Sequence, residues 1–199
     1  MGDGGYCRVG AGVDELRFRL FFRGSLAANG RPNQKWEIRQ QFATQLECLW
    51  SQEPLKSSAK YRDDSHQPND CYLGENRNGI NYFPIVSEKV FTVAELDILM
   101  LRPGDPGLIT VGGGDLDNRL KTLLDGLQPP NPNDTFVPEN FDRTQPVACL
   151  LQDDKLITRL NVETDRLLEP DVHGNEVVMI VQVLIRASSP RMCNHWAAS

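Results

Sequence analysis

The sequence predicts a single α+β domain in which a mixed β-sheet carries two main helices. Three observations predict it: segments that alternate apolar and polar residues, two segments with apolar residues at helical spacing, and their order along the chain. That order is strand, helix, strand, helix, strand, strand, which is typical of helices packed on one sheet. With 199 residues, 40% of them hydrophobic, the chain is long enough to bury one core.

The first strand and the first helix are expected near the N-terminus. The stretch ELRFRLFFRG (15–24) alternates leucine or phenylalanine with arginine, which is typical of a half-buried strand. The turn-forming stretch SLAANGRPN follows it. In QKWEIRQQFATQLECLW (34–50), apolar residues recur every three or four positions, so we expect an amphipathic helix there.

The remaining elements follow in the second half of the chain. Residues 90–103 predict the second strand, and residues 115–127 predict the second helix, with leucines at helical spacing. Residues 155–164 alternate again, and EVVMIVQVLIRA (176–187) is a long apolar strand that fits either the centre of a sheet or an interface.

One domain is expected over residues 15–187. We expect residues 1–14 to form a flexible N-terminal segment and residues 188–199 to form a C-terminal tail. Polar stretches at about 51–80 and 128–148 are expected to be insertions that decorate the functional edge.

The cysteines and the lack of long apolar runs limit the class of protein. Five cysteines without C-x-x-C spacing are typical of reduced thiols rather than of disulfides or a zinc site. No apolar run approaches the roughly 20 residues that span a bilayer, and the start of the chain lacks an apolar signal segment. We therefore expect a cytoplasmic protein with no membrane partner.

Basic residues gather early in a chain whose net charge is -6, and this charge argues against indiscriminate binding to nucleic acid. Two interpretations remain open: a local basic face that contacts phosphates, or ordinary solvated surface charge. The first interpretation assigns sequence-independent phosphate contacts to these residues: Arg17, Arg19, Arg31, Lys35 and Arg39.

Two aspartates, Asp115 and Asp117, stand at the start of the second expected helix. Helix capping and the helix dipole explain one such carboxylate without any function. Asp117, Lys121 and Asp125 follow one another at intervals of four residues, so they share one face of that helix. Capping does not explain this second feature.

A second carboxylate pair, Asp153 and Asp154, precedes the strand expected at 155–164. If the two pairs converge, they offer hard oxygen ligands that suit Mg²⁺ or Mn²⁺ better than zinc. Two such ions roughly 4 Å apart activate a water and stabilise the leaving oxygen of a phosphodiester. A nearby lysine neutralises charge that grows on the phosphate.

The pattern D-x-D-N-x-x-K-x-x-x-D-x-L, followed later by D-D before a strand, resembles the signature of RusA-type endodeoxyribonucleases, the Holliday junction resolvases common in prophages. The resemblance implies a small RusA-like nuclease fold over the expected domain, a homodimer, dependence on Mg²⁺ and a branched DNA substrate. It makes Asp115, Asp117, Asp154 and Lys121 catalytic. The three aspartates bind metal together with Asp153, and Asn118 and Asp125 support the site.

The chain also departs from that family. Family members are shorter and more basic, and they often carry basic residues ahead of the D-x-D, where this chain has Gly112, Gly113 and Gly114. One alternative is therefore an inactive module of the same fold that binds nucleic acid or protein. Another is a different D-x-D phosphoryl or glycosyl transferase, although no nucleotide-binding motif is recognisable. The choice among four-way junction, flap, fork and RNA substrates stays open.

Overall fold

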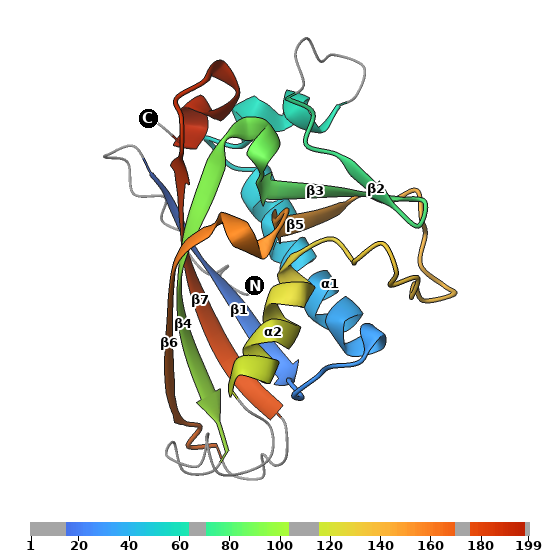
Figure 1. Cartoon of the computed structure of the whole chain (residues 1–199), viewed down its shortest axis with the longest axis vertical. Helices are drawn as coiled ribbons and strands as arrows, with labels where there is room; N and C mark the ends of the chain where they lie inside the picture. The colour runs from blue at the N-terminus through green and yellow to red at the C-terminus, as the bar shows by residue number, and fades with distance from the viewer. Residues whose placement is uncertain (1–14, 64–70, 104–115, 170–175, 198–199) are drawn as a thin grey trace, which may run out of the picture.

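Two β-sheets and two α-helices make up the computed structural model, which describes residues 15–63, 71–103, 116–169 and 176–197 (Figure 1). The larger sheet has the strand order β1-β7-β4-β6, and the smaller one has the order β2-β3-β5. Each sheet contains both parallel and antiparallel neighbours. The expected single α+β domain with mixed sheet pairing is confirmed, and the expected segment 1–14 lies outside the described residues.

The larger sheet contains the four strands expected from the sequence. They are β1 (Leu16–Ser25), β4 (Thr92–Arg102), β6 (Ile157–Arg166) and β7 (Glu176–Ala187). Strand β7 pairs antiparallel with β1 on one side and with β4 on the other, so the most apolar strand is central in its own sheet. Strand β6 runs parallel to β4 at the opposite edge.

Both expected helices, α1 (Pro32–Trp50) and α2 (Leu116–Leu127), pack on the same face of the larger sheet (Figure 1). A proline at the start of α1 suits a helix because its fixed φ fits the first turn and it has no N–H to satisfy. The two helices and the sheet share one core. Their side chains with at most 1% exposure include Ile38, Phe42, Leu46, Leu123 and Leu127.

The smaller sheet is absent from the sequence prediction. It consists of β2 (Glu75–Arg77), β3 (Ile80–Val86) and β5 (Val147–Leu151). All of β5 and all but one residue of β3 are buried, so neither strand alternates apolar and polar residues. Strand β2 lies within the expected insertion at 51–80, and β5 begins at the end of the one expected at 128–148.

The end of the chain packs into the core, where the sequence analysis expected a C-terminal tail. The short helix η6 (Met192–Ala197) buries Cys193 and Trp196. The Asn194 side chain is fully buried and donates hydrogen bonds to the carbonyls of Val90 and Ser189, at 2.9 and 2.8 Å. Over the described ranges, no helix combines the length and the apolar character needed to cross a membrane.

Glutamine side chains of α1 cover part of the free edge of β1. Phe21 N–H donates to Gln45 Oε1 at 2.8 Å, and Gln45 Nε2 donates back to the Phe21 carbonyl at 2.7 Å. Gln41 and Gln34 donate in the same way to carbonyls further along the strand. These amides occupy backbone groups that another strand would otherwise pair with.

The two helices approach each other closely at Gly126. A Cβ at this position would lie 2.4 Å from Ile38 Cγ2, which is far shorter than a van der Waals contact. We expect Gly126→Ala to destabilise the protein by about 1–3 kcal/mol, because overpacking outweighs the roughly 1 kcal/mol gained in helix propensity. Urea unfolding measures this change.

Ile38→Ala supplies the control for this prediction. It removes the side chain that the new Cβ would meet, so the double variant should lose less stability than the sum of the two single variants. Strict additivity would show that the close approach at Gly126 does not limit packing.

Tyr82 and Cys149 lie together in a second apolar cluster around the smaller sheet. The Tyr82 hydroxyl is buried and, among the described residues, finds no hydrogen-bond partner. Burial raises the pKa of Tyr82 to about 12, and burial also raises the pKa of the Cys149 thiol to about 12. Both groups therefore resist ionisation in the folded protein.

These raised pKa values predict that stability falls at alkaline pH. The unfolded chain releases these protons near its ordinary pKa values, about 8.5 for cysteine and about 10 for tyrosine, so above pH 9 it binds fewer protons than the folded protein. We expect a loss on the order of 3 kcal/mol between pH 9 and 11, measured by urea unfolding. The Tyr82→Phe/Cys149→Ala variant should flatten this profile; an unchanged slope would assign it to other groups.

Candidate functional site

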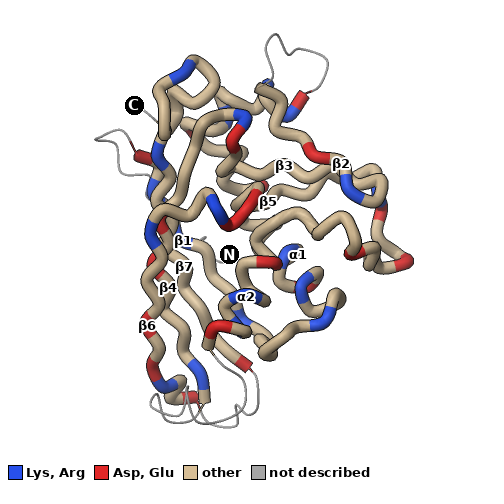
Figure 2. Tube along the Cα trace, viewed as in Figure 1, with Lys and Arg blue, Asp and Glu red and all other residues tan. Residues whose placement is uncertain are grey.

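Helix α2 presents two residues of the motif to solvent. Asp117, in its first turn, and Lys121, one turn later, are exposed. Neither side chain forms a hydrogen bond or an ion pair with the rest of the described chain. Asp125, one further turn along, pairs with Lys35 Nζ at 2.6 Å. Acidic and basic positions therefore alternate along α2, next to the start of α1 (Figure 2).

Asn118 and Thr122 join the first half of α2 to the loop ahead of α1. The Thr122 hydroxyl donates to the Asn118 carbonyl at 3.0 Å and accepts from Gly30 N–H at 2.8 Å. Asn118 is half-buried beside the exposed Asp117. The supporting role expected for Asn118 stays a prediction, because these hydrogen bonds involve its backbone and not its side chain.

The second carboxylate pair follows β5 directly. Asp153 caps the short helix η5 (Asp154–Leu156), since its Oδ1 accepts from Lys155 N–H at 3.0 Å. Asp154 is exposed, and no described side chain or backbone group pairs with its carboxylate. The sequence analysis expected this pair to open a strand; in the structure η5 stands between the pair and β6.

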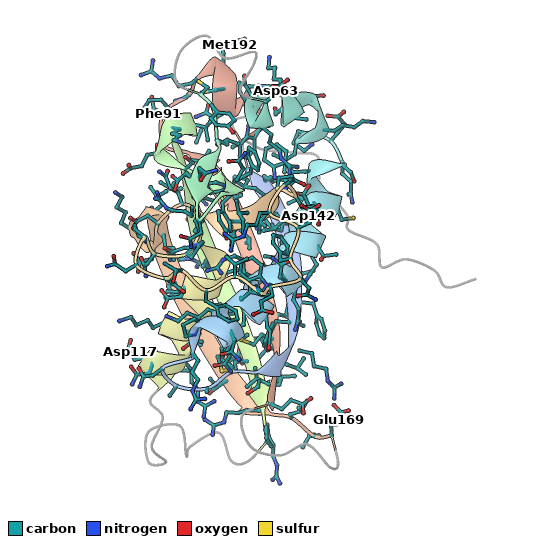
Figure 3. All side chains as sticks on the ribbon, turned by 90° about the vertical axis from the view of Figure 1, so that its right-hand side faces the viewer. Asp63, Phe91, Asp117, Asp142, Glu169 and Met192 are labelled. Atoms are coloured by element: carbon teal, nitrogen blue, oxygen red, sulfur yellow. The ribbon has the colours of Figure 1, made fainter. Side chains whose placement is uncertain are left out.

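The described residues keep the two groups of carboxylates apart. Asp117 lies in the lower half of the molecule in Figure 3, where α2 begins. In Figure 1, the orange turn between β5 and β6, which contains η5, lies above the upper, C-terminal end of α2. Within the described ranges, no three His, Cys, Asp or Glu side chains lie close enough together to hold a metal ion. Asp115 and Gly112–Gly114 fall outside the described residues.

Two arginines that the sequence analysis did not single out lie near the start of α2. Arg119 is buried and donates to the Leu26 carbonyl. Its burial and the nearby charge of Arg102, the last residue of β4, both lower the pKa of Arg119. Arg119 stands inside the D-x-D-N-x-x-K motif, and this was the only signal for it.

The basic residues expected to contact phosphates separate into different places. Arg31 and Lys35 lie at the start of α1, and Lys35 is already paired with Asp125 beside α2. Arg17 and Arg19 point to the opposite face of the larger sheet. Arg17 pairs there with Glu15 at 2.7 Å, and Arg19 donates to Gln182 Oε1 at 3.1 Å.

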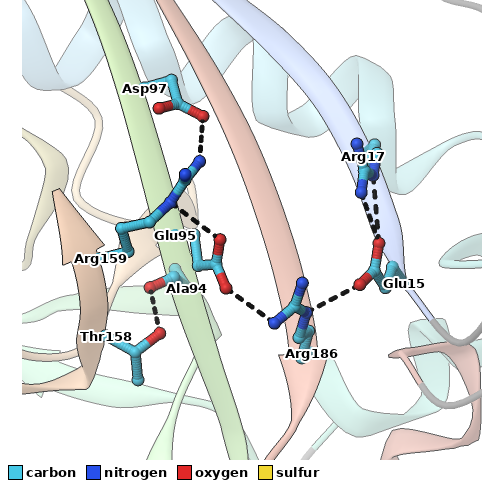
Figure 4. Close-up of polar contacts among 8 residues, drawn as sticks. All are labelled: Glu15, Arg17, Ala94, Glu95, Asp97, Thr158, Arg159 and Arg186. Atoms are coloured by element: carbon cyan, nitrogen blue, oxygen red, sulfur yellow. Dashed lines mark hydrogen bonds and ion pairs between the residues drawn. The ribbon is translucent and has the colours of Figure 1, made fainter. Parts of the chain in front are cut away.

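A ladder of ion pairs crosses that outer face (Figure 4). Arg186 bridges Glu15 and Glu95, at 2.8 and 2.7 Å. Arg159 then bridges Glu95 and Asp97, at 3.0 and 2.6 Å. The Arg159 guanidinium is therefore bound to surface acids on the sheet face that points away from α2. Such exposed pairs each contribute little to stability.

Arg39 has a structural position, unlike the phosphate contact expected from the sequence. It is 3% exposed, and its guanidinium donates to the carbonyls of Gln128 and Asp125, at 2.6 and 2.9 Å. These carbonyls belong to the C-terminal end of α2, where backbone acceptors lack helical partners. Arg39 thus binds α1 to the end of α2 and does not present its charge to a ligand.

No protein-family model, no curated protein and no solved structure matches this chain. The resemblance to RusA-type nucleases therefore rests on the motif residues of α2 and of the turn after β5.

The position of Arg39 predicts a loss of stability rather than of ligand binding. We expect Arg39→Leu to destabilise the protein by about 2–4 kcal/mol, because two part-buried carbonyls lose a charged donor. Urea unfolding measures this loss. The control is Arg31→Leu, at the exposed N-terminal end of the same helix, for which we expect little change in stability. Weaker DNA binding with unchanged stability would instead return Arg39 to the phosphate-contacting set.

Proposed function

We propose that this protein is a Mg²⁺-dependent endonuclease that cuts branched DNA by hydrolysis. One observation carries the proposal: Asp117 and Lys121 lie one turn apart on α2, and both are exposed. Neither side chain has a partner in the described chain. Unpaired charges of opposite sign at adjacent turns are available to a ligand. The same two positions are essential in the motif that resembles the RusA signature.

The donor set fits a hard divalent cation. The carboxylate oxygens of Asp117 and Asp154 are exposed and are the ligands that Mg²⁺ or Mn²⁺ prefers, whereas Asp153 already accepts a backbone hydrogen bond. Asp115, Asp117 and Asp154 would hold the ion if the start of α2 and the turn after β5 came together, since no three such side chains converge within the described residues. A bound Mg²⁺ would polarise the scissile phosphate and lower the pKa of an attacking water.

The chain's own residues would bind and orient the phosphate. Lys121 would place its ammonium beside the phosphate oxygens and neutralise the charge that develops there. Arg102 would add positive charge at the same end of α2. The ion pair of Asp125 with Lys35, at 2.6 Å, would hold α2 in place against α1 and so support the site.

The resemblance supplies the remaining parts of the proposal. Branched DNA would be the substrate, a second copy of the chain would be the partner in a homodimer, and the protein would act in the cytoplasm. The exposed start of α1, with Arg31, would contact the DNA backbone without reading its sequence.

One observation favours a second candidate, a catalytically inactive module that binds nucleic acid or protein. Asp117 lies in the first turn of α2, whereas the turn between β5 and β6 lies beyond the other end of this helix in Figure 1. An active site built from both would need a rearrangement or an additional ligand. The net charge of -6 also suits a protein partner.

Cleavage of a labelled four-way junction, a fork and a linear duplex, in Mg²⁺ or in EDTA, tests the proposal. We expect the wild type to cut the branched substrates only in Mg²⁺. Asp117→Asn and Lys121→Gln should each slow cutting at least about 100-fold, because each removes charge that the transition state needs. Glu163→Gln is the matched control: this exposed acid lies on β6, outside the motif, and should cut at the wild-type rate.

The outcomes separate the candidates. Junction binding without cutting, in every divalent metal tested, would replace the nuclease by the binding module. Normal cutting by Asp154→Asn, together with loss in Asp117→Asn, would keep the nuclease and remove Asp154 from its metal site. A protein that neither binds nor cuts these substrates contradicts both candidates.

A further inference from the structure

Part of the free edge of β1 carries backbone groups that no other described residue covers. Because Phe21 turns its N–H and C=O toward α1, the period of two along a strand turns those of Arg19 and Arg17 toward the same edge. In the described ranges, no hydrogen bond reaches these groups of Arg17 and Arg19. The glutamines of α1 thus close the edge from Phe21 onward and leave Leu16–Leu20 open.

A hollow of about 200 Å³ adjoins this open stretch. Its apolar lining comes from Phe18, Leu20 and Leu49, and its polar rim includes Gln45 and Cys48. Side chains of a strand added at this edge would alternate between the two faces of the sheet. Those on the inner face would lie next to the hollow, and those on the outer face would lie next to Arg17 and Arg19.

Charge at the edge discriminates between possible occupants. Arg17 is 61% exposed beside its partner Glu15, and Arg19 is exposed and, within the described residues, bonds only to the neutral Gln182. If two copies of β1 paired antiparallel about Phe18, Arg17 of each would lie opposite Arg19 of the other, and like charges directly opposite destabilise a sheet. An acidic strand would instead bring a carboxylate to each arginine.

We propose that the open edge of β1 binds an extended acidic segment of a partner protein, which adds to the larger sheet as a short strand. The segment has the pattern acidic, apolar, acidic: the apolar side chain enters the hollow, and the two carboxylates lie beside Arg17 and Arg19. Backbone hydrogen bonds give this mode its affinity, and the hollow and the arginines give it specificity. The glutamine amides from Phe21 onward limit the added strand to a short motif.

A fluorescein-labelled peptide, GSDLDSG, is the probe, and fluorescence anisotropy measures its affinity. The comparison peptides GSKLKSG and GSDGDSG change the charge and the apolar residue, and we expect each to bind at least about tenfold more weakly. Cys48→Trp, which fills the hollow from an exposed helix position, should weaken GSDLDSG about tenfold or more. Arg17→Gln/Arg19→Gln should weaken it by a similar factor, since this variant removes both positive charges that face the two carboxylates.

Arg23→Gln is the control, because it removes a charge of the same strand beyond the open stretch and should leave the affinity unchanged. Urea unfolding establishes that each variant remains folded. If the wild type does not bind GSDLDSG, or if Cys48→Trp and Arg17→Gln/Arg19→Gln bind it as tightly as the wild type does, the proposal is overturned. A dimer of the protein alone that Cys48→Trp dissociates, seen by sedimentation, would assign this edge to a second copy and would also overturn it.

Discussion

The placement of α2 depends on the hydrogen bonds between Arg39 of α1 and the last carbonyls of α2. A twelve-residue helix has little stability of its own, so its position comes from what it packs against. Arg39 anchors its C-terminal end, and Arg119 anchors its N-terminal half to the Leu26 carbonyl. Between them, Gly126 allows contact with Ile38. With both ends fixed, only one face of α2 can reach solvent, and that face carries Asp117 and Lys121.

Most of the larger sheet and both helices follow from the sequence because each of them buries only one side. In β1, arginine alternates with leucine or phenylalanine, and the buried positions are the apolar ones. The smaller sheet lacks this alternation of buried and exposed residues. Strand β5 is buried along its whole length, and a run of five apolar residues fits a buried strand or a buried helix segment equally well. The sequence did not predict η6 for a different reason. Asn194 is polar, yet it is buried because its side-chain amide donates hydrogen bonds to three backbone carbonyls.

The candidate site was predictable as a list of residues but not as an arrangement. The spacing of Asp117 and Lys121 places both on one helix face, because helical periodicity is a local property. Whether Asp154 meets them depends on how the chain crosses from α2 through β5 to β6, and local spacing says nothing about that path. Arg39 shows the same limit. It stands among the polar residues of an amphipathic pattern, and its partners are backbone atoms almost 90 positions away.

The glutamines that close the edge of β1 protect it by a different means from the charged residues on the outer face. Ion pairs such as those of Arg159 and Arg186 weaken as salt screens them over about 8–10 Å. The bonds from Gln45 to Phe21 join neutral groups, so added salt has little effect on them. The covered part of the strand therefore keeps its resistance to edge-to-edge aggregation in concentrated salt, where repulsion between molecules no longer separates them.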